Sequence, residues 1–479
     1  MALGRTTAIA LLGVQAVPVE VEADISPGVP GLTMVGSLDK ALQEARDRVR
    51  AAATNAGVPV PQRKVVVSLT PASLPKHGSG FDLAIAVAVL AAARRIDPTS
   101  AAEAVHLGEL GLDGRLRPVP GVLPAVLAAV RMGRSRVVVP AADAEEASLV
   151  PGARVVGAVC LADVVRAHGG EVPARDGNPP EAVPRSTCGP PTPTAPHRDL
   201  RDVAGQDEAR RALEVAAAGA HHLLMTGPPG AGKTMLASRL PGLLPDLDDH
   251  DALEVTAVHS VLGSFDPAQG LIRRPPYEDP HHTASTAAVV GGGLGVPRPG
   301  SATRAHRGVL FLDEALEFAR PVLDALRQPL EEGRLVIARR QMSACFPARF
   351  QLVMAANPCP CGRAVGKATD CSCAPLAQRR YASRLSGPIR DRIDLQIEVL
   401  PVSRGQMTGP HAPVREDTAK VAARVAVARA VQADRWAGSG WKTNGEVPGP
   451  ALRSRWRLGP AVTADLDRAL ERGLVTVRG

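Results

Sequence analysis

The sequence predicts a multidomain α/β protein built around a phosphate-binding loop. Short apolar runs that fit β-strands alternate with Ala-rich stretches that fit helices along most of the chain. A glycine-rich loop at Gly227 to Thr234 lies between one such strand and a helix. At 479 residues, the chain is long enough for about three domains. We therefore expect two α/β units and a smaller third unit.

Residues 1–169 have the pattern of an α+β domain. Strands are predicted at Val19 to Val21, Lys64 to Leu69, Arg136 to Val139 and Val155 to Val156. Helices are predicted over 38–56, 81–93 and 122–132, where Ala and Leu recur at helical spacing.

A linker is predicted at residues 170–198, which contain eight prolines together with Gly, Ser and Thr. Such a composition cannot bury a core and acts as a semi-rigid spacer. Residues 199–400 return to strands and helices and form the predicted core domain. Residues 401–479 are predicted to form a small helical unit, with helices at 417–435 and 463–471.

Composition excludes several classes of protein. Hydrophobic residues make up 45% and charged residues 22%, which is a globular balance rather than a disordered one. No apolar run reaches the roughly 18 residues that a membrane span requires, and the N-terminus has no signal-peptide cleavage pattern. We therefore expect a cytosolic protein with reduced thiols. The net charge of +8, spread over scattered Arg residues, permits a nucleic-acid partner without requiring one.

The strongest motif is G-P-P-G-A-G-K-T, which matches G-x-x-x-x-G-K-[ST]. An apolar strand at Leu223 to Met225 precedes it and a helical stretch follows. Glycines let backbone N–H groups approach phosphate oxygens, Lys233 is expected to reach the β- and γ-phosphates, and Thr234 is expected to bind Mg²⁺. The predicted ATP-binding residues are Gly227, Pro228, Pro229, Gly230, Ala231, Gly232, Lys233 and Thr234.

Two further apolar strands end in polar residues. The run GVLFLDE delivers Asp313, expected to hold Mg²⁺, and Glu314, expected to polarise the attacking water. Alone, two acids after a strand would more often be surface residues. The run FQLVMAAN ends at Asn357, which is expected to orient the water or to sense the γ-phosphate. The alternative for Asn357 is a turn-forming residue before Pro358.

Many ordered blocks of the chain resemble one family, the magnesium-chelatase-like AAA+ ATPases of the ComM/YifB group. The blocks are PHHTAS (280–285), GGG (291–293), PRPG (297–300), AHRGVLFLDE (305–314), LRQPLEEG (326–333), FPARF (346–350), NPCPCG (357–362) and RLSGPIRDRIDL (384–395). The resemblance implies a P-loop AAA+ core with an inserted hairpin near 265–300, a C-terminal helical lid, and a hexameric ring with ATP sites between subunits. It also implies a Lon-protease-like N-terminal domain, of the ribosomal S5 domain 2-like class.

The resemblance further implies an arginine finger and a cargo. Arg392, in D-R-I-D, is similar to the arginine that reaches a neighbouring subunit's ATP site, and Arg384 is the second candidate. The alternative is that Arg392 forms an ion pair with Asp391 or Asp394. Relatives of the ComM type imply branch-migration helicase activity on DNA, in recombination or natural transformation. A chelatase subunit that drives metal insertion is the alternative.

Four of the seven cysteines cluster as C-x-C, nine residues, then C-x-C: Cys359, Cys361, Cys371 and Cys373. Four thiolates suffice for one tetrahedral Zn²⁺, which would be structural because every ligand comes from the protein. The spacing is not the usual C-x₂-C, so reduced cysteines without a metal are the alternative.

The Lon-like segment suggests a Ser-Lys protease as a rival function. Alignment of GSGFDLAIA with the protease's serine loop places Gly80 where the nucleophile should be, and Leu123 stands where the lysine should be. Ser79 and Lys76 lie nearby, but a shifted pair would need new geometry. Assembly or DNA contact is therefore the expected role of this domain.

Two departures from the family pattern bear on hydrolysis. The chain stops at Val477, Arg478 and Gly479, where the family is expected to continue into a helix that carries a second nucleotide-sensing arginine, so the lid is expected to be incomplete. The stretch Ser301 to Arg304 lacks an expected carboxylate, and Asp279 before Pro280 also differs. A subunit that binds ATP with impaired hydrolysis is therefore a third hypothesis.

Overall fold

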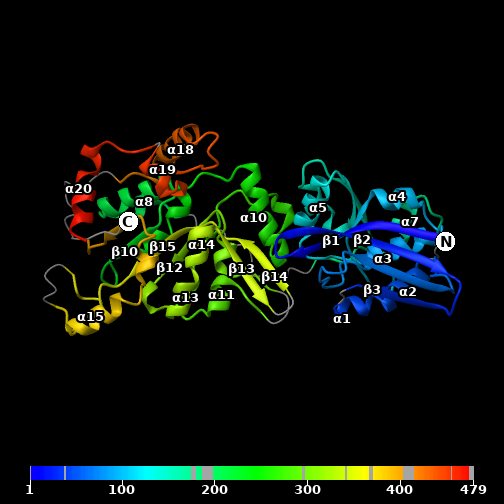
Figure 1. Ribbon diagram of the computed structural model, residues 1–479. Helices are drawn as coiled ribbons and strands as arrows, with labels where there is room; N and C mark the ends of the chain where they lie inside the picture. Colours follow the sequence, from blue (N-terminus) through cyan, green and yellow to red (C-terminus); the bar gives the residue numbers. More distant parts are fainter. Residues whose placement is uncertain are drawn as a thin grey trace.

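The computed structural model describes residues 2–36, 39–173, 180–185, 198–293, 297–339, 342–365, 370–402, 415–454 and 456–473. These residues form an elongated molecule (Figure 1). A sheet built from the N-terminal residues lies at one end, and a second sheet lies with the C-terminal helices at the other.

The N-terminal sheet has seven strands in the order β3-β4-β2-β1-β5-β8-β9. The pairs β1–β2 and β2–β4 are antiparallel, whereas the pairs β3–β4, β1–β5, β5–β8 and β8–β9 are parallel. The strands are β1 (Ala2–Leu12), β2 (Gln15–Ser26), β3 (Gly31–Val35), β4 (Lys64–Thr70), β5 (Val105–His106), β8 (Arg136–Pro140) and β9 (Arg154–Ala158). A separate short ribbon pairs β6 (Glu109–Leu110) with β7 (Leu116–Arg117).

Helices cover this sheet, and one of them is wholly buried. All eleven residues of α3 (Asp82–Ala92) lie in the core, which explains why the segment is apolar on every side. Its small Ala side chains allow close packing against β1 and β2, so few aromatic residues are needed. The other helices are α1 (Lys40–Gln43), α2 (Ala45–Asn55), α4 (Pro98–Glu103), α5 (Val122–Arg131), α6 (Ala144–Ser148) and α7 (Leu161–Ala167). The strands and helices predicted for this part of the sequence are confirmed.

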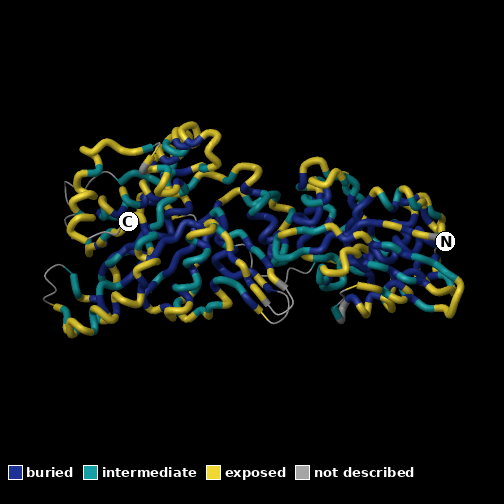
Figure 2. The backbone as a smooth tube through the Cα atoms, in the orientation of Figure 1, coloured by how far each residue is buried: buried dark blue, intermediate teal, exposed yellow. Residues whose placement is uncertain are grey.

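The second sheet has five parallel strands in the order β11-β12-β15-β10-β16. They are β10 (Leu223–Thr226), β11 (Tyr277–Glu278), β12 (Val309–Leu312), β15 (Gln351–Ala356) and β16 (Leu395–Glu398). Every residue of β12 and β15 is buried, as expected for a parallel sheet covered on both faces. Figure 2 shows this buried layer beneath exposed helices and loops.

The helices around the second sheet are α8 (Asp207–Gly219), α9 (Lys233–Ala237), α10 (Asp249–Leu262), α11 (Thr286–Val290), α12 (Ser301–Arg304), α13 (Arg320–Ala325), α14 (Arg327–Glu332), α15 (Pro375–Ala382) and α16 (Gly387–Arg390). The C-terminal helices are α18 (Thr418–Arg435), α19 (Gly449–Arg453) and α20 (Pro460–Glu471). Both helices predicted beyond residue 401 are therefore confirmed. Among the described helices, none combines the length and apolar character needed to cross a bilayer.

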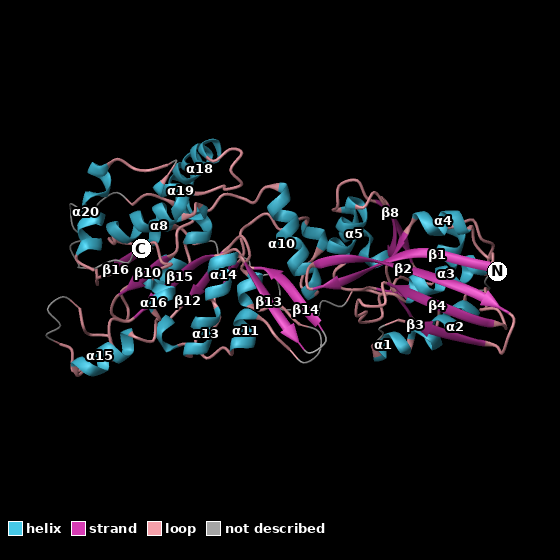
Figure 3. Cartoon of the chain, in the orientation of Figure 1, coloured by secondary structure: helices cyan, strands magenta, loops and turns pink. Residues whose placement is uncertain are grey.

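The structure tests the hairpin expected near 265–300 only in part, because residues 294–296 lie outside the described residues. In the described part of that stretch, only β11 is a strand, and Gly292 and Arg298 form a single antiparallel bridge. Its several prolines cannot donate ladder hydrogen bonds. Further along the chain, β13 (Arg334–Arg339) and β14 (Met342–Pro347) form an antiparallel hairpin, and Figure 3 shows it extending towards the N-terminal sheet.

The N-terminal sheet unit contacts the second sheet unit at several points. Gly13, at the β1–β2 turn, forms a bridge with Cys345 of β14. Helix α10 packs on α5, where the backbone N–H of Gly121 donates to the carbonyl oxygen of Ser260 at 3.1 Å. Of the predicted linker, the structure describes 170–173, 180–185 and 198, and Arg185 forms an ion pair with the buried Glu146. Residues 477–479, on which the expectation of an incomplete lid rests, lie outside the described residues.

Candidate ATP site

Three strands of the second sheet deliver the predicted site residues to one edge. Register pairs Thr226 with Ala356 and Leu312 with Met354, so β10, β15 and β12 end side by side. The phosphate loop follows β10, Asn357 follows β15, and Asp313 with Glu314 follows β12. In parallel sheets, ligands bind beyond the carboxyl ends of the strands. This edge is therefore the candidate functional site.

Lys233 is folded back into the loop that precedes it. Its Nζ donates to the carbonyl oxygens of Gly227 at 2.6 Å and Pro228 at 2.9 Å, and to Asn357 Oδ1 at 3.2 Å. Burial lowers the pKa of the Lys233 ammonium, and the carboxylates of Asp313 and Glu314 oppose that shift. The arrangement presents a cation with exchangeable hydrogen bonds, which suits the binding of a polyphosphate.

Thr234 of α9 and Asp313, which follows β12, are brought together by the fold. Thr234 Oγ1 donates to Asp313 Oδ2 at 2.7 Å. A hydroxyl and a carboxylate oxygen are the ligands that Mg²⁺ accepts in nucleotide sites, with the remaining positions filled by phosphate oxygens and water. These two residues therefore fit a Mg²⁺ that arrives with a nucleotide.

Glu314 has an unusual backbone and an unexpected partner. Its φ of +50° places a non-glycine residue in the left-handed region, which occurs most often at functional sites. Its Oε2 lies 3.1 Å from His282 Nδ1, in the segment before α11. His282 lies in the sequence block PHHTAS, but the sequence alone assigned it no role. Only the fold brings this block to the end of β12.

Two other contacts support the phosphate loop and were not predicted from the sequence. Gln206, at the start of α8, donates through Nε2 to the carbonyl oxygens of Ala231 at 3.0 Å and Leu400 at 2.6 Å. Gly362 lies so close to the loop that an added Cβ would be 2.5 Å from Pro229 Cδ. Neither residue belongs to a recognisable nucleotide motif, so the sequence offered no signal for them.

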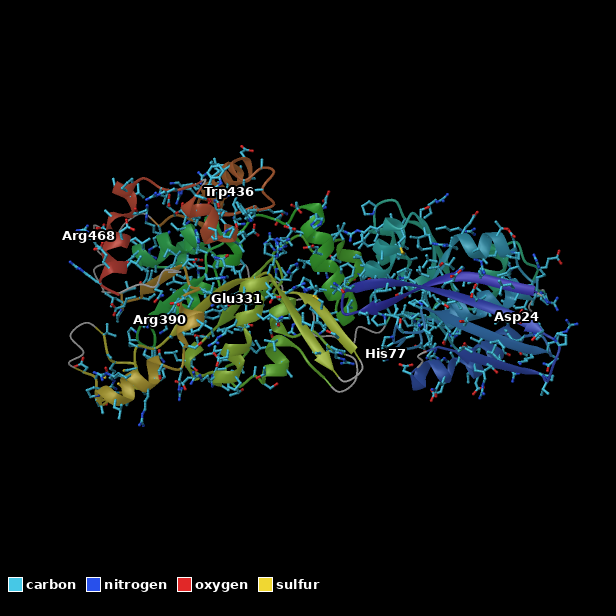
Figure 4. The ribbon with its side chains drawn as sticks, viewed as in Figure 1. Asp24, His77, Glu331, Arg390, Trp436 and Arg468 are labelled. Carbon is cyan, nitrogen blue, oxygen red and sulfur yellow. The ribbon has the colours of Figure 1, made fainter. Side chains whose placement is uncertain are left out.

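The two candidate arginines make contacts within the chain. Arg392 forms an ion pair with Glu331 of α14, and only 7% of its side chain is exposed. Figure 4 labels Glu331 on this helix, beside the second sheet. Arg384 Nη1 donates to the Leu316 carbonyl oxygen and to Glu317 Oε2, both at 2.8 Å. The ion pair with Glu331 was not considered from the sequence, and Arg392 Nη1 also donates to the Pro388 carbonyl oxygen.

The residues that depart from the family pattern also have partners. Arg304 forms a two-pronged ion pair with Glu278, with distances of 2.9 and 2.8 Å. Burial raises the pKa of Asp279, and the nearby Asp313 adds to the shift.

The cysteines 359, 361, 371 and 373 come together beside the same edge, with all four sulfur atoms within 4.8 Å of one another. They follow β15 directly, because Cys359 is two residues beyond Asn357. Cys359 is buried and the other three are partly exposed.

The geometry offers no support for a Ser-Lys protease. Lys76 is fully buried, and its Nζ donates to the carbonyl oxygens of Leu69 and Pro71. Ser79 Oγ instead donates to Glu109. Leu123 lies in the apolar core, and Gly80 carries no side chain. Within the described part of the N-terminal unit, these residues form no nucleophile–base pair.

Comparisons with known families cover most of the chain. The family described as magnesium chelatase, subunit ChlI, matches residues 199–407. The family described as subunit ChlI of Mg-chelatase matches residues 21–143, and that of the subunit ChlI C-terminal region matches residues 415–479.

Three relatives are similar over nearly their whole length. An uncharacterized protein of Mycobacterium tuberculosis is 50% identical, covering 100% of this chain and 92% of its own. The uncharacterized protein YifB of Escherichia coli is 42% identical, covering 96% and 87%. Competence protein ComM of Haemophilus influenzae is 44% identical, covering 91% and 84%.

Shorter matches agree with the mixed α/β architecture. Lon protease 2 of Bacillus subtilis is 29% identical over 29% of this chain and 26% of its own, and the magnesium-chelatase 38 kDa subunit of Rhodobacter capsulatus is 30% identical over 34% and 51%. The long matches and the geometry of the strand ends lead to one assignment. The chain belongs to the ComM/YifB family of magnesium-chelatase-like AAA+ ATPases.

Proposed function

We propose that the chain is an ATP-hydrolysing motor subunit that works as a homo-oligomeric ring, a hexamer, and remodels branched DNA in the cytosol. The observation that carries the ATPase part is the convergence of Lys233, Thr234, Asp313, Glu314 and Asn357 at one sheet edge. The proposal includes two metals: Mg²⁺ bound with ATP, and a structural Zn²⁺ at the four clustered cysteines.

Each residue at the edge has a role that its contacts support. Lys233 would exchange its carbonyl partners for the β- and γ-phosphate oxygens, while Thr234 and Asp313 would hold Mg²⁺ between them. Glu314, held by His282, would orient and polarise the attacking water. Asn357, already hydrogen-bonded to Lys233, would respond to the γ-phosphate. Bound Mg²⁺ would neutralise charge that develops on the transferred phosphoryl group.

The ring part of the proposal concerns Arg392. A guanidinium supplied by a neighbouring subunit would complete the ATP site, and such a group is worth about 10³- to 10⁵-fold in turnover in related chemistry. Within one subunit, Arg392 is paired with Glu331, so it would have to leave that partner to act. Arg384 remains the second candidate, because 47% of its side chain is exposed.

The DNA part of the proposal rests on the net positive charge of the chain and on its sequence similarity to ComM. The chain carries a net charge of +8, and its relative ComM is described as a competence protein. A motor that tracks DNA neutralises phosphates and releases counterions, so its affinity should fall as salt rises. The chelatase alternative is favoured by the description of the matching family, magnesium chelatase.

The experiment is steady-state ATP hydrolysis by the purified chain without DNA, with single-stranded DNA and with a four-way junction. We expect turnover that DNA stimulates and that Glu314→Gln abolishes while ATP binding is retained. If DNA does not change the rate of ATP hydrolysis at any salt concentration, the DNA part of the proposal is refuted and the chelatase alternative is favoured. ATP binding without turnover would refute the motor and favour a subunit with impaired hydrolysis.

Mixing two inactive variants tests the shared site. Lys233→Ala lacks the phosphate contact but keeps Arg392, whereas Arg392→Ala keeps the phosphate loop but lacks the guanidinium. If the site lies between subunits, mixed rings contain some complete sites, and activity should reappear above the sum of the separate variants. No recovery in rings shown to exchange subunits would contradict the proposed role of Arg392. Arg384→Ala in the same mixture would test the second candidate.

A further inference from the structure

The four clustered cysteines place their sulfur atoms at the corners of a small cage. Cys359 Sγ lies 3.4 Å from Cys361 Sγ and 3.7 Å from Cys371 Sγ, and Cys361 Sγ lies 3.7 Å from Cys371 Sγ. Cys373 Sγ lies within 4.8 Å of the other three. Four thiols thus converge in one loop, although uncharged thiols attract one another only weakly.

These distances match a single tetrahedral ion. With Zn–S bonds of about 2.3 Å, the sulfur atoms of a Zn(Cys)₄ site are separated by about 3.8 Å. A disulfide would need about 2.05 Å between two sulfur atoms, which none of the three measured pairs approaches. An iron–sulfur cluster would spread the thiolates further apart, because they would surround several iron atoms rather than one.

A side-chain amide donates a hydrogen bond to the sulfur cluster. Gln378, on α15, donates through Nε2 to Cys371 Sγ at 3.3 Å and to the Cys373 carbonyl oxygen at 3.2 Å. Donors of this kind stabilise thiolate charge and orient the ligands of a metal site.

Little of the described part of the cysteine loop is buried. Among its described residues from Pro358 to Ala374, only Cys359 and Gly362 are buried. So little buried apolar surface cannot offset the conformational entropy lost when the loop becomes ordered. A bound ion supplies folding free energy directly in such small cysteine-rich elements.

The cysteine loop lies against the ATP site. Gly362 has φ +75°, and a Cβ added there would meet Pro229 at 2.5 Å (Cδ) and 2.8 Å (Cγ). The backbone of the loop therefore supports the phosphate loop directly. Asn357 directly precedes the cysteine loop, and its side chain accepts a hydrogen bond from Lys233.

We infer that Cys359, Cys361, Cys371 and Cys373 bind one Zn²⁺, and that the ion holds the cysteine loop against Pro229 so that nucleotide affinity depends on the metal. The second half rests on the proposed ATPase function, whereas the first half stands on the sulfur geometry alone. The metal would hold the wall of the nucleotide site in place and would take no part in hydrolysis.

The test measures metal content and nucleotide affinity separately on the full-length chain. Elemental analysis should find one zinc per chain, and Co²⁺ exchanged into the protein should show the visible absorption of a tetrahedral tetrathiolate. Cys371→Ser with Cys373→Ser should remove the zinc and weaken binding of a fluorescent ATP analogue by roughly 10- to 100-fold, the usual loss when the support of a site is removed. Circular dichroism would verify that both sheets remain folded.

Two variants separate the steps of the inference. Gly362→Val should keep the zinc but weaken nucleotide binding, because its side chain would displace the cysteine loop from Pro229. Cys345→Ser, which changes a cysteine of β14 outside the cluster, should alter neither quantity.

Four outcomes would overturn all or part of the inference. A chain without zinc and with four freely reactive thiols would refute the site, and iron with acid-labile sulfide would refute the single ion. Unchanged ATP affinity after loss of zinc would refute the coupling alone. Zinc present in a wild-type chain that binds no nucleotide would refute the proposed function while leaving the metal site intact.

Discussion

Replacing Gly227 with Ala tests whether the phosphate loop is fixed by the neighbouring strand. A Cβ at this position would lie 2.2 Å from the Val399 carbonyl oxygen and 3.1 Å from its carbon. Carbon–oxygen contacts in proteins are rarely shorter than about 3.3 Å, so one backbone must move by about 1 Å. Val399 cannot move easily, because its N–H donates to the Thr226 carbonyl oxygen at 2.7 Å. The displacement must therefore fall on the phosphate loop.

The expected cost appears in both stability and binding. Overpacking of this kind destabilises a protein by about 1–3 kcal/mol, which corresponds to roughly 2–4 °C in Tm for each kcal/mol in a domain of this size. A 1 Å displacement of binding groups costs about 100-fold in function. Isothermal titration with ATP and differential scanning calorimetry would measure the two effects.

Gly230→Ala is the matched control for Gly227→Ala. It lies in the same loop, has φ +77°, and has no atom within 4 Å of an added Cβ. Only the left-handed backbone strain of about 1–2 kcal/mol should therefore appear. If Gly227→Ala bound ATP as tightly as the wild type, the argument that Val399 limits the loop would be wrong.

Three further predictions follow from individual contacts. His282→Ala should lower kcat about tenfold at unchanged KM for ATP, because His282 holds the half-exposed Glu314 carboxylate, and His281→Ala should not; equal effects of the two variants would contradict this. Burial lowers the pKa of His168 to about 4, so protonation of this imidazole disfavours the folded state. The free energy of unfolding should therefore be highest above about pH 6.5 and should fall by about 3 kcal/mol as the pH drops towards 4. Urea unfolding at pH 7.5 and 5.0 would measure this, and His168→Gln should reduce the difference. Arg185→Ala should destabilise the chain by about 3–5 kcal/mol, because it leaves the buried Glu146 without its cation. A loss below about 1 kcal/mol in the same urea assay would show that this ion pair does not stabilise the fold.

The strand ends of the second sheet were predictable because the signal is local. Fully buried parallel strands must be short and apolar throughout, and the residue that follows each of them is placed at the sheet edge. The runs before Asp313 and Asn357 satisfy this rule, and β12 and β15 end where it predicts. The sequence could therefore identify these residues without knowing the order of the strands.

The partners of those residues were not predictable, because they depend on chain segments that are distant in sequence. His282 lies in the block PHHTAS, to which the sequence assigned no chemical role, and Gln206 lies in a turn without a motif. Glu331 could not be chosen as the partner of Arg392 over the nearer aspartates. The hairpin of β13 and β14 was not predicted either, because alternation of side chains marks these two strands only weakly.

The pairing of Arg392 with Glu331 bears on how a ring could control turnover. Arg392 has 7% of its side chain exposed, whereas Glu331 has 45%. Because water already hydrates the Glu331 carboxylate, breaking this ion pair costs little free energy. A phosphate group is a stronger partner for guanidinium, because it accepts charge-assisted hydrogen bonds at several oxygens. If Arg392 acts on a neighbouring subunit as proposed, the exchange of Glu331 for phosphate would require both ring assembly and bound nucleotide. A single subunit would then keep the arginine inactive, and hydrolysis would depend on protein concentration.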